Sequence, residues 1–158
     1  RREVSFMILL LKKYRFVLAA LGFAAAIMLV IFTLFSIDNS TNKMIVEYLE
    51  GIGWEVEDSP VEIAHLTLPE RFDTVYETYN AVQTESGYDM SPFKGKSVSR
   101  YSYRVINHKR SASVEVIANI FVYENRIIAG DISSTAPNGF MHGLNETENI
   151  FKTAADGN

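Results

Sequence analysis

The longest apolar stretch of the chain is residues 16–37, which contain no charged residue, no proline and no histidine. At a rise of about 1.5 Å per residue this stretch forms a helix of roughly 33 Å, enough to cross a hydrocarbon core of ~30 Å. A buried core helix would carry polar residues along one face, and here only Thr33 and Ser36 interrupt the run. A cleaved signal peptide would place small residues after the apolar run, whereas Ala24, Ala25 and Ala26 lie inside it. We therefore predict one uncleaved transmembrane helix over residues 16–37.

Charge bias predicts how this helix is oriented. Five basic residues and only Glu3 precede it, and an acidic segment follows it. Positive charge next to a membrane span stays cytoplasmic, so residues 1–15 form a cytoplasmic basic segment and residues 38–146 lie outside the cell membrane. We expect a single-pass protein whose partner through residues 16–37 is the lipid bilayer. The sequence begins at Arg1 rather than at a methionine, which allows either residues upstream or a start at Met7.

Residues 38–146 have the size of one domain, and hydrophobic spacing predicts its elements. A polar stretch over residues 38–42 offers helix caps, and Gly51 and Gly53 end the helix that follows it. Trp54 comes directly after this end, and we expect it to anchor the core. Residues 147–158 are predicted to be a weakly ordered tail. The predicted helices cover 44–50 and 70–85, and the predicted strands cover 61–68, 98–107, 114–123 and 126–134.

The second helix has the clearest periodicity. Its apolar positions follow the spacing of one helical face, and they are Phe72, Val75, Tyr76, Tyr79 and Val82. A capping box from Thr67 to Glu70, with Pro69 in the first turn, predicts where this helix begins. The aromatic stripe could line a ligand groove, but such a stripe is more often part of the core, and we interpret it as core.

The order of these elements predicts an α+β domain. We expect an antiparallel sheet of three or four strands with two helices on one of its faces. The segment 114–123 is apolar at successive positions, which is typical of a central strand. Glu124 and Asn125 separate it from the next strand and predict a tight hairpin turn, since Asn tolerates positive φ.

Charge excludes some partners of this domain. After Ile37 the chain has ten basic and eighteen acidic residues, a net charge of −8, which argues against nucleic acid as a partner. Seven basic residues nevertheless gather between Lys94 and Arg126. They could form a patch for an acidic envelope polymer, or these basic strands could face the acidic helices and neutralise them, and we favour neutralisation.

Candidate chemistry is sparse. The chain has no cysteine. Its histidines are His65 in a predicted strand, His108 in a polar loop and His142 in a terminal loop, and they lack the spacing of metal ligands, so we expect no metal and no cofactor. No nucleophile elbow or other catalytic signature is present. The densest group of unusual residues runs from Gly130 to Leu144, and the weak candidates for ligand binding there are Asp131, Asn138 and His142. The alternative is a turn-rich loop that packs Phe140 and Met141 on the sheet edge.

Several motifs together resemble a known family. They are Tyr48-Leu49 with Gly53-Trp54-x-Val56, Leu68-Pro69-x-x-Phe72-x-x-Val75-Tyr76-x-x-Tyr79-Asn80, Gly87-Tyr88-Asp89, Tyr101-x-Tyr103-x-Val105-x-Asn107 and Gly130-Asp131-Ile132. The pattern resembles an uncharacterised family of Gram-positive bacterial membrane-anchored proteins, the domain of unknown function number forty-eight thirty. The resemblance covers nearly all of residues 43–145 and implies one anchor followed by one extracytoplasmic domain. It implies no activity and supplies no catalytic residues. Where the family has Gly-Gly-Asp, this chain has Ala129-Gly130-Asp131.

Two function classes follow. The first is a non-enzymatic interaction or sensing module at the outer face of the membrane, with an envelope protein or polymer as its partner. The alternative is a cell-envelope hydrolase or transferase that uses the region of Asp131 and His142. The absence of a catalytic pattern favours the first class, so that we expect no catalytic residues.

Overall fold

The computed structural model describes residues 2–147, apart from the side chains of residues 2–13, 15, 16, 18 and 33–38. Most of the predicted tail, residues 148–158, lies outside the described residues. Helix α1 covers Arg2–Gly51, and the chain divides into two compact units between Ser40 and Thr41. The helix continues through residues 38–42, so the predicted break at this polar stretch is wrong.

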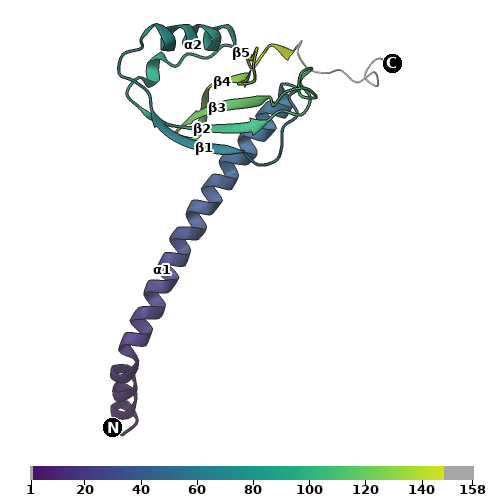
Figure 1. The fold of residues 1–158 in the computed structure, drawn as a ribbon. Helices are drawn as coiled ribbons and strands as arrows, with labels where there is room; N and C mark the ends of the chain where they lie inside the picture. Colours follow the sequence, from purple (N-terminus) through teal and green to yellow (C-terminus); the bar gives the residue numbers. More distant parts are fainter. Residues whose placement is uncertain (1, 148–158) are drawn as a thin grey trace. The chain divides into compact units, whose positions relative to one another are not determined.

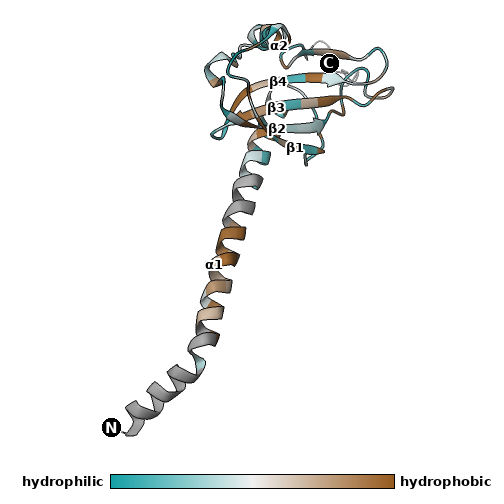
Figure 2. Ribbon diagram, turned by 60° about the vertical axis from the view of Figure 1, so that its left-hand side comes forward, coloured by the Kyte–Doolittle hydropathy of each residue, from teal (hydrophilic) through white to brown (hydrophobic). Residues whose placement is uncertain are grey.

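The first unit consists of the amino-terminal part of α1. Side chains between residues 19 and 32 are exposed in this unit, including Phe23 at 71% and Met28 at 72%. Figure 2 shows apolar colours along this stretch of the helix. Nowhere in the described part of the chain is a helix both long enough and apolar enough to cross a membrane. The predicted span over 16–37 rests in part on residues 16, 18 and 33–37, whose side chains are outside that description.

The second unit is built on a five-stranded antiparallel sheet in the order β1-β2-β3-β4-β5, which confirms the α+β class (Figure 1). A short 3-10 helix, η1 (Ser91–Phe93), precedes β2. The strands are β1 (Glu62–Thr67), β2 (Ser97–Arg104), β3 (Ile117–Tyr123), β4 (Arg126–Ser134) and β5 (Phe140–Gly143).

The predicted number of three or four strands is therefore too low. The missing strand is β5, which has only four residues and directly follows Pro137, Asn138 and Gly139. Turn-forming residues dominate the local signal there, and only pairing with β4 makes the segment a strand. His142 consequently lies in a strand and not in a loop.

The two helices pack against opposite faces of the sheet, which corrects the expectation of a single helical face. Side chains alternate between faces along a strand, so Tyr101 and Tyr103 of β2 share one face with Ala118 and Ile120 of β3. The end of α1 packs there, and we call this the α1 face. Phe121 points to the other side, where it meets α2, and we call this the α2 face.

The α1 face carries the main core of the domain. Trp54 is fully buried beside the sheet, as its position after Gly53 predicted, and its Nε1 donates to the Leu144 carbonyl over 2.7 Å. Fully buried apolar side chains in this core are Ile45, Leu49, Trp54, Tyr103, Ala118, Ile120, Ile132 and Leu144.

Helix α2 (Thr74–Glu85) begins four residues later than predicted. Asp73 is its N-cap, because its carboxylate accepts a hydrogen bond from the Tyr76 backbone N–H over 2.9 Å. The capping box predicted from Thr67 is wrong, since Thr67 is the last residue of β1 and its hydroxyl lies 3.3 Å from that of Ser97.

The buried side of α2 is also displaced from the apolar stripe. Val75 is 73% exposed, whereas Asn80 and Gln83 are buried. Their amide groups bond to the loop after α2 and to the sheet, so polar anchoring rather than apolar periodicity sets how the helix is turned. Tyr76 and Tyr79 lie at the edge of this contact and pack against the second core cluster.

The hairpin between β3 and β4 follows the sequence prediction. Glu124 and Asn125 have φ values of 45° and 60°, as a tight turn with two left-handed central residues requires. β3 is the central strand of the five, which explains why apolar residues fill both of its faces.

Candidate functional site

A row of polar side chains crosses the α2 face. The strand register places Glu62, Ser102, Asn119 and Asp131 on neighbouring strands from β1 to β4. Helix α2 lies over the part of this face beyond Arg100 and Phe121, so the row occupies the half that α2 leaves open. A polar row at the centre of a sheet is informative, because Glu, Ser, Asn and Asp side chains are usually exposed at the surface.

These side chains are joined by hydrogen bonds. The Tyr79 hydroxyl from α2 donates to Asp131 Oδ2 over 2.6 Å, and Asn119 Nδ2 donates to Asp131 Oδ1 over 3.0 Å. Asn119 Nδ2 also lies 3.1 Å from Ser133 Oγ, and Ser102 Oγ donates to Asn119 Oδ1 over 2.8 Å. Asp131 is only 2% exposed, so the network replaces the hydration that its carboxylate would have in water.

The same contacts determine the protonation of Tyr79. Burial raises the pKa of Tyr79 well above its ordinary value, and the negative charge of Asp131 and the hydrogen bond to it act in the same direction. Arg100 opposes them more weakly. Tyr79 is therefore a permanent donor to Asp131 and a poor general base, which suits a structural role.

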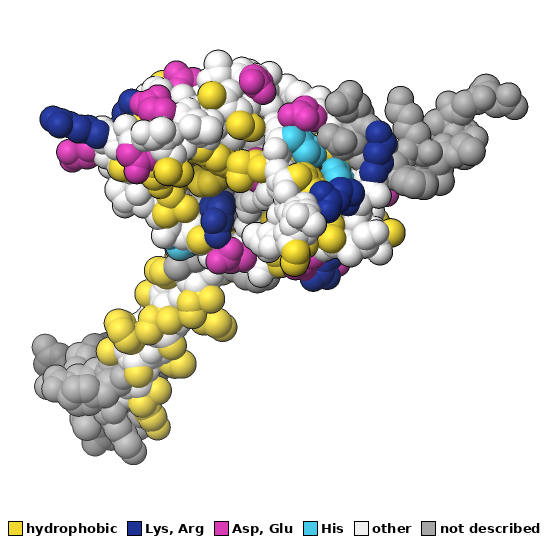
Figure 3. All heavy atoms as spheres, turned by 45° about the horizontal axis from the view of Figure 1, so that its top comes forward, with side chains coloured by type: hydrophobic (Ala, Val, Ile, Leu, Met, Phe, Trp, Pro, Cys, Tyr) yellow, Lys and Arg dark blue, Asp and Glu magenta, His cyan; other side chains and the backbone are white. Residues whose placement is uncertain are grey.

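Three hollows adjoin along the side of α2. The first, of about 400 Å³, is apolar and lies between α2 and Met141; the second, of about 310 Å³, lies between α2 and β1, β2 and β3; the third, of about 440 Å³, lies over the polar row. Val75 and Tyr79 line the first and the second hollow, and Arg100 lines the second and the third. We call the three together the α2 groove. Figure 3 shows apolar side chains gathered on this side of the domain, with basic and acidic ones at their border.

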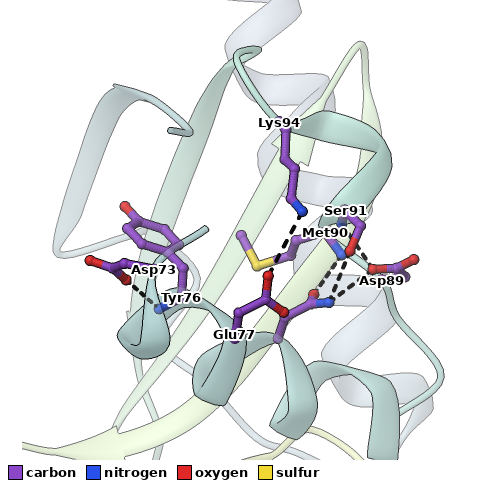
Figure 4. Close-up of polar contacts among 8 residues, drawn as sticks. Asp73, Tyr76, Glu77, Asp89, Met90, Ser91 and Lys94 are labelled. Carbon is purple, nitrogen blue, oxygen red and sulfur yellow. Dashed lines mark hydrogen bonds and ion pairs between the residues drawn. The ribbon is translucent and has the colours of Figure 1, made fainter. Parts of the chain in front are cut away.

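The loop after α2 holds the helix in place beside this groove (Figure 4). Asn80 Nδ2 donates to Asp89 Oδ1 over 2.9 Å, and its Oδ1 accepts the Met90 N–H over 2.8 Å. The hydrogen bonds from Asn80 and Ser91 lower the pKa of the Asp89 carboxyl. Lys94 lies 3.9 Å from Glu77 and 4.4 Å from the centre of the Phe72 ring.

Gln83 connects α2 to the sheet directly. Its Oε1 accepts the Gly130 N–H over 2.8 Å, next to the irregularity in register between β3 and β4. Its Nε2 is buried and has no hydrogen-bond partner among the described residues. Position 130 favours glycine for a separate reason, because a Cβ there would meet Leu144 Cδ1 at 2.6 Å and the Asn119 carbonyl oxygen at 2.9 Å.

A second cluster of functional side chains lies on the other side of the sheet. His108 stacks between Trp54 and Phe140, with ring centres 5.9 and 4.7 Å away, and Arg110 lies 4.9 Å over the Phe140 ring. His142 joins this stack, and its Nε2 is 3.4 Å from Nε2 of His108. Both imidazoles are buried. Burial lowers the pKa of His108, and electrostatic repulsion from His142 and from the cationic Arg110 and Lys109 lowers it further.

This histidine pair is not arranged as a metal site. Nδ1 of His108 accepts the Arg110 N–H over 3.0 Å, so the neutral ring carries its proton on Nε2, where a metal would have to bind. Among the described residues, no group of three or more His, Cys, Asp or Glu side chains could hold a metal ion.

The structure separates the ligand-binding candidates that the sequence placed together. Asp131 and His142 point to opposite faces, because Asp131 is on the α2 face and His142 pairs with Ile132 on the α1 face. Asn138 lies in the loop before β5 with a φ of 61°, and its carbonyl accepts from both terminal nitrogens of Arg110 over 3.3 Å.

Sequence reasoning missed several members of these clusters. It placed His108 in a polar loop, and it gave no role to Tyr79, Asn119 or Arg100 beyond packing and charge. One signal was available: Asn119 is the single amide inside the apolar segment 114–123. Such a residue in a central strand needs buried partners, and a polar network supplies them.

The basic residues of β2 are paired rather than free. Arg100 Nη2 lies 2.6 Å from Glu62, and Arg104 contacts Glu57 and Glu115 at 3.0 and 2.8 Å. Hydrogen bonds to Glu115 and Glu57 raise the pKa of Arg104. These pairs agree with neutralisation, but the acids come from β1 and from segments flanking the strands rather than from helices.

Comparison with known proteins places the domain in a family. A family model described as Domain of unknown function (DUF4830) matches residues 48–132, from the last turn of α1 to the Gly130-Asp131-Ile132 motif of β4. No curated protein and no solved structure matches the chain. The matched segment contains Trp54 of the core, Tyr79 and the whole polar row from Glu62 to Asp131. The chain belongs to the DUF4830 family.

Proposed function

We propose that this protein is a non-enzymatic interaction or sensing module, held at the outer face of a cell membrane by residues 16–37. The observation that carries the binding role is the α2 groove. It exposes Val75 and Met141, at 73% and 51%, in one apolar hollow, and contiguous exposed apolar surface is typical of an interaction site.

The chemistry of the groove favours binding over catalysis. Asp131 is only 2% exposed and each of its carboxylate oxygens already accepts a hydrogen bond, one from Tyr79 and one from Asn119, so it is poorly accessible to a substrate in the groove. The alternative of a hydrolase or transferase needs Asp131 and His142 to act on one substrate, and their positions on opposite faces of the sheet give it no support.

Support for the membrane anchor comes from the sequence. Residues 16–37 carry no charge, basic residues precede them, and an acidic domain follows. The backbone over these residues is helical, as a bilayer requires of a single span. We propose that the domain from residue 38 onward faces the outside, with an envelope protein or polymer as its partner.

Site-directed photo-crosslinking in cells tests the binding role. A photoreactive phenylalanine at position 75 or 141 is expected to give the same adduct, because both side chains line one hollow. Position 106 is the matched control, since Ile106 is 55% exposed and lines none of the three hollows. Equal labelling from all three positions, or none from the groove, would contradict the proposal.

Two measurements test the anchor independently of the groove. Protein that remains in the membrane fraction after an alkaline wash supports a span over residues 16–37. Protease added to intact spheroplasts is expected to digest the domain after residue 38. Protection of that domain from protease would contradict the proposed orientation. Release of the protein by the alkaline wash would contradict the proposed anchor.

A further inference from the structure

His108 and His142 connect two segments that are far apart in the sequence. His108 begins the loop that ends at Ser113, and His142 belongs to the edge strand β5. We propose that the two imidazoles form a pH-sensitive latch, which holds β5 against this loop when both are neutral and releases it when the pair takes up a proton.

Hydrogen bonds assign a complementary tautomer to each ring. Nδ1 of His108 accepts the Arg110 N–H, so the proton of neutral His108 is on Nε2. Nδ1 of His142 lies 2.9 Å from the Gly143 carbonyl, which can only accept, so the proton of neutral His142 is on Nδ1. Nε2–H of His108 then points at the lone pair of Nε2 of His142, and all four ring nitrogens have a matched partner.

An additional proton has no favourable place in this arrangement. On His108 Nδ1 it would face the Arg110 N–H, and on His142 Nε2 it would face Nε2–H of His108. Either position turns a donor–acceptor contact into a contact between two donors. The pair must therefore separate to be protonated, unless nearby charge compensates.

The surrounding charges do not compensate. On the loop, Lys109 and Arg110 are positive, and both oppose protonation of His108. Two carboxylates belong to segments packed against the pair: Glu146 accepts from the Gly143 N–H over 3.2 Å, and Glu55 follows Trp54. Neither bonds to an imidazole, and burial adds to the cost of the charged form.

Strand β5 couples the latch to the opposite side of the sheet. Met141, the residue before His142, lines the apolar hollow beside α2. Asn145, just after β5, donates to the Ser86 carbonyl at the carboxyl end of α2 over 2.9 Å. Release of β5 would therefore open the α2 groove on its Met141 side. This last consequence rests on the proposed binding function, whereas the latch itself does not.

Trp54 reports on the latch in the intact protein, because it is the only tryptophan of the chain and contacts both rings. For the full chain in detergent micelles, we expect the Trp54 emission to weaken and shift to longer wavelength between about pH 8 and about pH 5. The midpoint is expected below the ordinary histidine pKa of 6.5, as the lowered pKa of His108 requires.

Hydrogen exchange distinguishes release from mere quenching by a protonated ring. The neutral form is favoured above pH 6.5, and its advantage is lost as the pH falls below that value. After correction for intrinsic rates, exchange of the β5 amides should rise by about tenfold per pH unit in this window. Amides of the central strand β3 should not follow. Unchanged exchange in β5 would overturn the latch even if the fluorescence changes.

Variants make the test specific. His108→Gln removes the imidazole with the lowered pKa, and His142→Gln removes its hydrogen-bond partner, so each should abolish the transition. His65→Gln should retain it, because His65 is exposed and bonds to Ser99. A transition that persists in the His108→Gln and His142→Gln double variant would overturn the proposal. If a variant does not fold, nitrogen NMR of the unmodified protein at about pH 8 decides, since it must show the Nε2–H tautomer for His108 and the Nδ1–H tautomer for His142.

The latch and the binding function can fail separately. Loss of crosslinking from positions 75 and 141, with an intact Trp54 transition, would remove the binding role and leave the latch. A groove that crosslinks equally at about pH 8 and about pH 5, without a Trp54 transition, would remove the latch alone.

Discussion

The two faces of the sheet are packed in different ways. On the α1 face, Ile45, Leu49 and Trp54 fill the space over β2 and β3 with fully buried apolar side chains. On the α2 face, Asn80 and Gln83 hold the helix through hydrogen bonds, and hollows remain beside it. Close packing stabilises the domain, whereas the looser polar face leaves surface for a partner. The comparison separates a stability face from a candidate binding face within one small sheet.

The largest expected effect tests the stability face. Trp54→Ala should lower the free energy of unfolding by about 3–5 kcal/mol, because it leaves a cavity and deprives the Leu144 carbonyl of its donor. Chemical denaturation followed by circular dichroism measures this change. Ile106→Ala, at a half-exposed position, should stay within about 0.5 kcal/mol. Similar costs for both variants would mean that Trp54 is not the centre of the core.

A second prediction tests whether the polar row supports the fold. Asp131→Ala should cost about 1.5–3 kcal/mol, because it leaves the Tyr79 hydroxyl and one Asn119 donor without their charged acceptor. Glu62→Ala is the matched control in the same row, since its pair with Arg100 is exposed and should contribute about 0–1 kcal/mol. If Asp131→Ala leaves the stability unchanged, Asp131 has no structural role, and a functional role of its carboxylate in the unmodified protein gains support.

The raised pKa of Tyr79 leads to a third prediction. The folded state keeps this hydroxyl protonated where the unfolded chain would lose its proton, so stability is retained below pH 10 and falls as the pH rises above it. Tyr79→Phe should remove part of that fall. Burial and the Tyr48 hydroxyl also raise the pKa of Tyr88, so its contribution remains in both proteins. Denaturation midpoints of the unmodified protein and of the Tyr79→Phe variant, measured at about pH 9 and about pH 11, show how much stability each loses. Parallel curves would contradict the buried Tyr79–Asp131 contact.

The smallest expected effect sharpens the comparison most. Val75→Ala should change the free energy of unfolding by no more than about 0.5 kcal/mol, because Val75 is 73% exposed. The apolar stripe of the sequence would instead make Val75 a core residue. If the free energy of unfolding fell by more than about 2 kcal/mol, Val75 would be a core residue after all, and the orientation of α2 about its own axis would be wrong.

The second helix shows where prediction from sequence succeeded and where it did not. Apolar spacing identified the helix and its end near Glu85, because local periodicity decides whether a segment is helical. It correctly placed Phe72, Tyr76 and Tyr79 against the core, but it made Val75 a core residue and missed the burial of two polar residues. Asn80 and Gln83 are buried because they bond to Met90 and Gly130, and local apolar periodicity does not reveal these contacts. The position of Asp73 as N-cap was also missed, although an Asp before a helical run is a known start signal.

The candidate sites show the same limit more strongly. Asp131 and His142 were identified by residue type, and the sequence put them near each other, in one strand and in the loop that follows it. Pairing of β4 with β5 sends their side chains to opposite faces, where each finds different partners. His108 could not be joined to His142 from the sequence, because 34 residues separate them and only the fold brings their rings together.

The sequence by itself determined the α+β class, the central strand β3, the hairpin at Glu124 and Asn125, and the buried position of Trp54. Each follows from local spacing or from the backbone preference of single residues. Only the tertiary structure decided that β5 is a strand, that the helices take opposite faces, and that Tyr79 meets Asp131 and His108 meets His142. These features depend on contacts between distant segments. Side chains alternate between the two faces of a strand, so a shift of one residue in strand pairing would move each side chain to the other face, and local sequence does not fix that pairing.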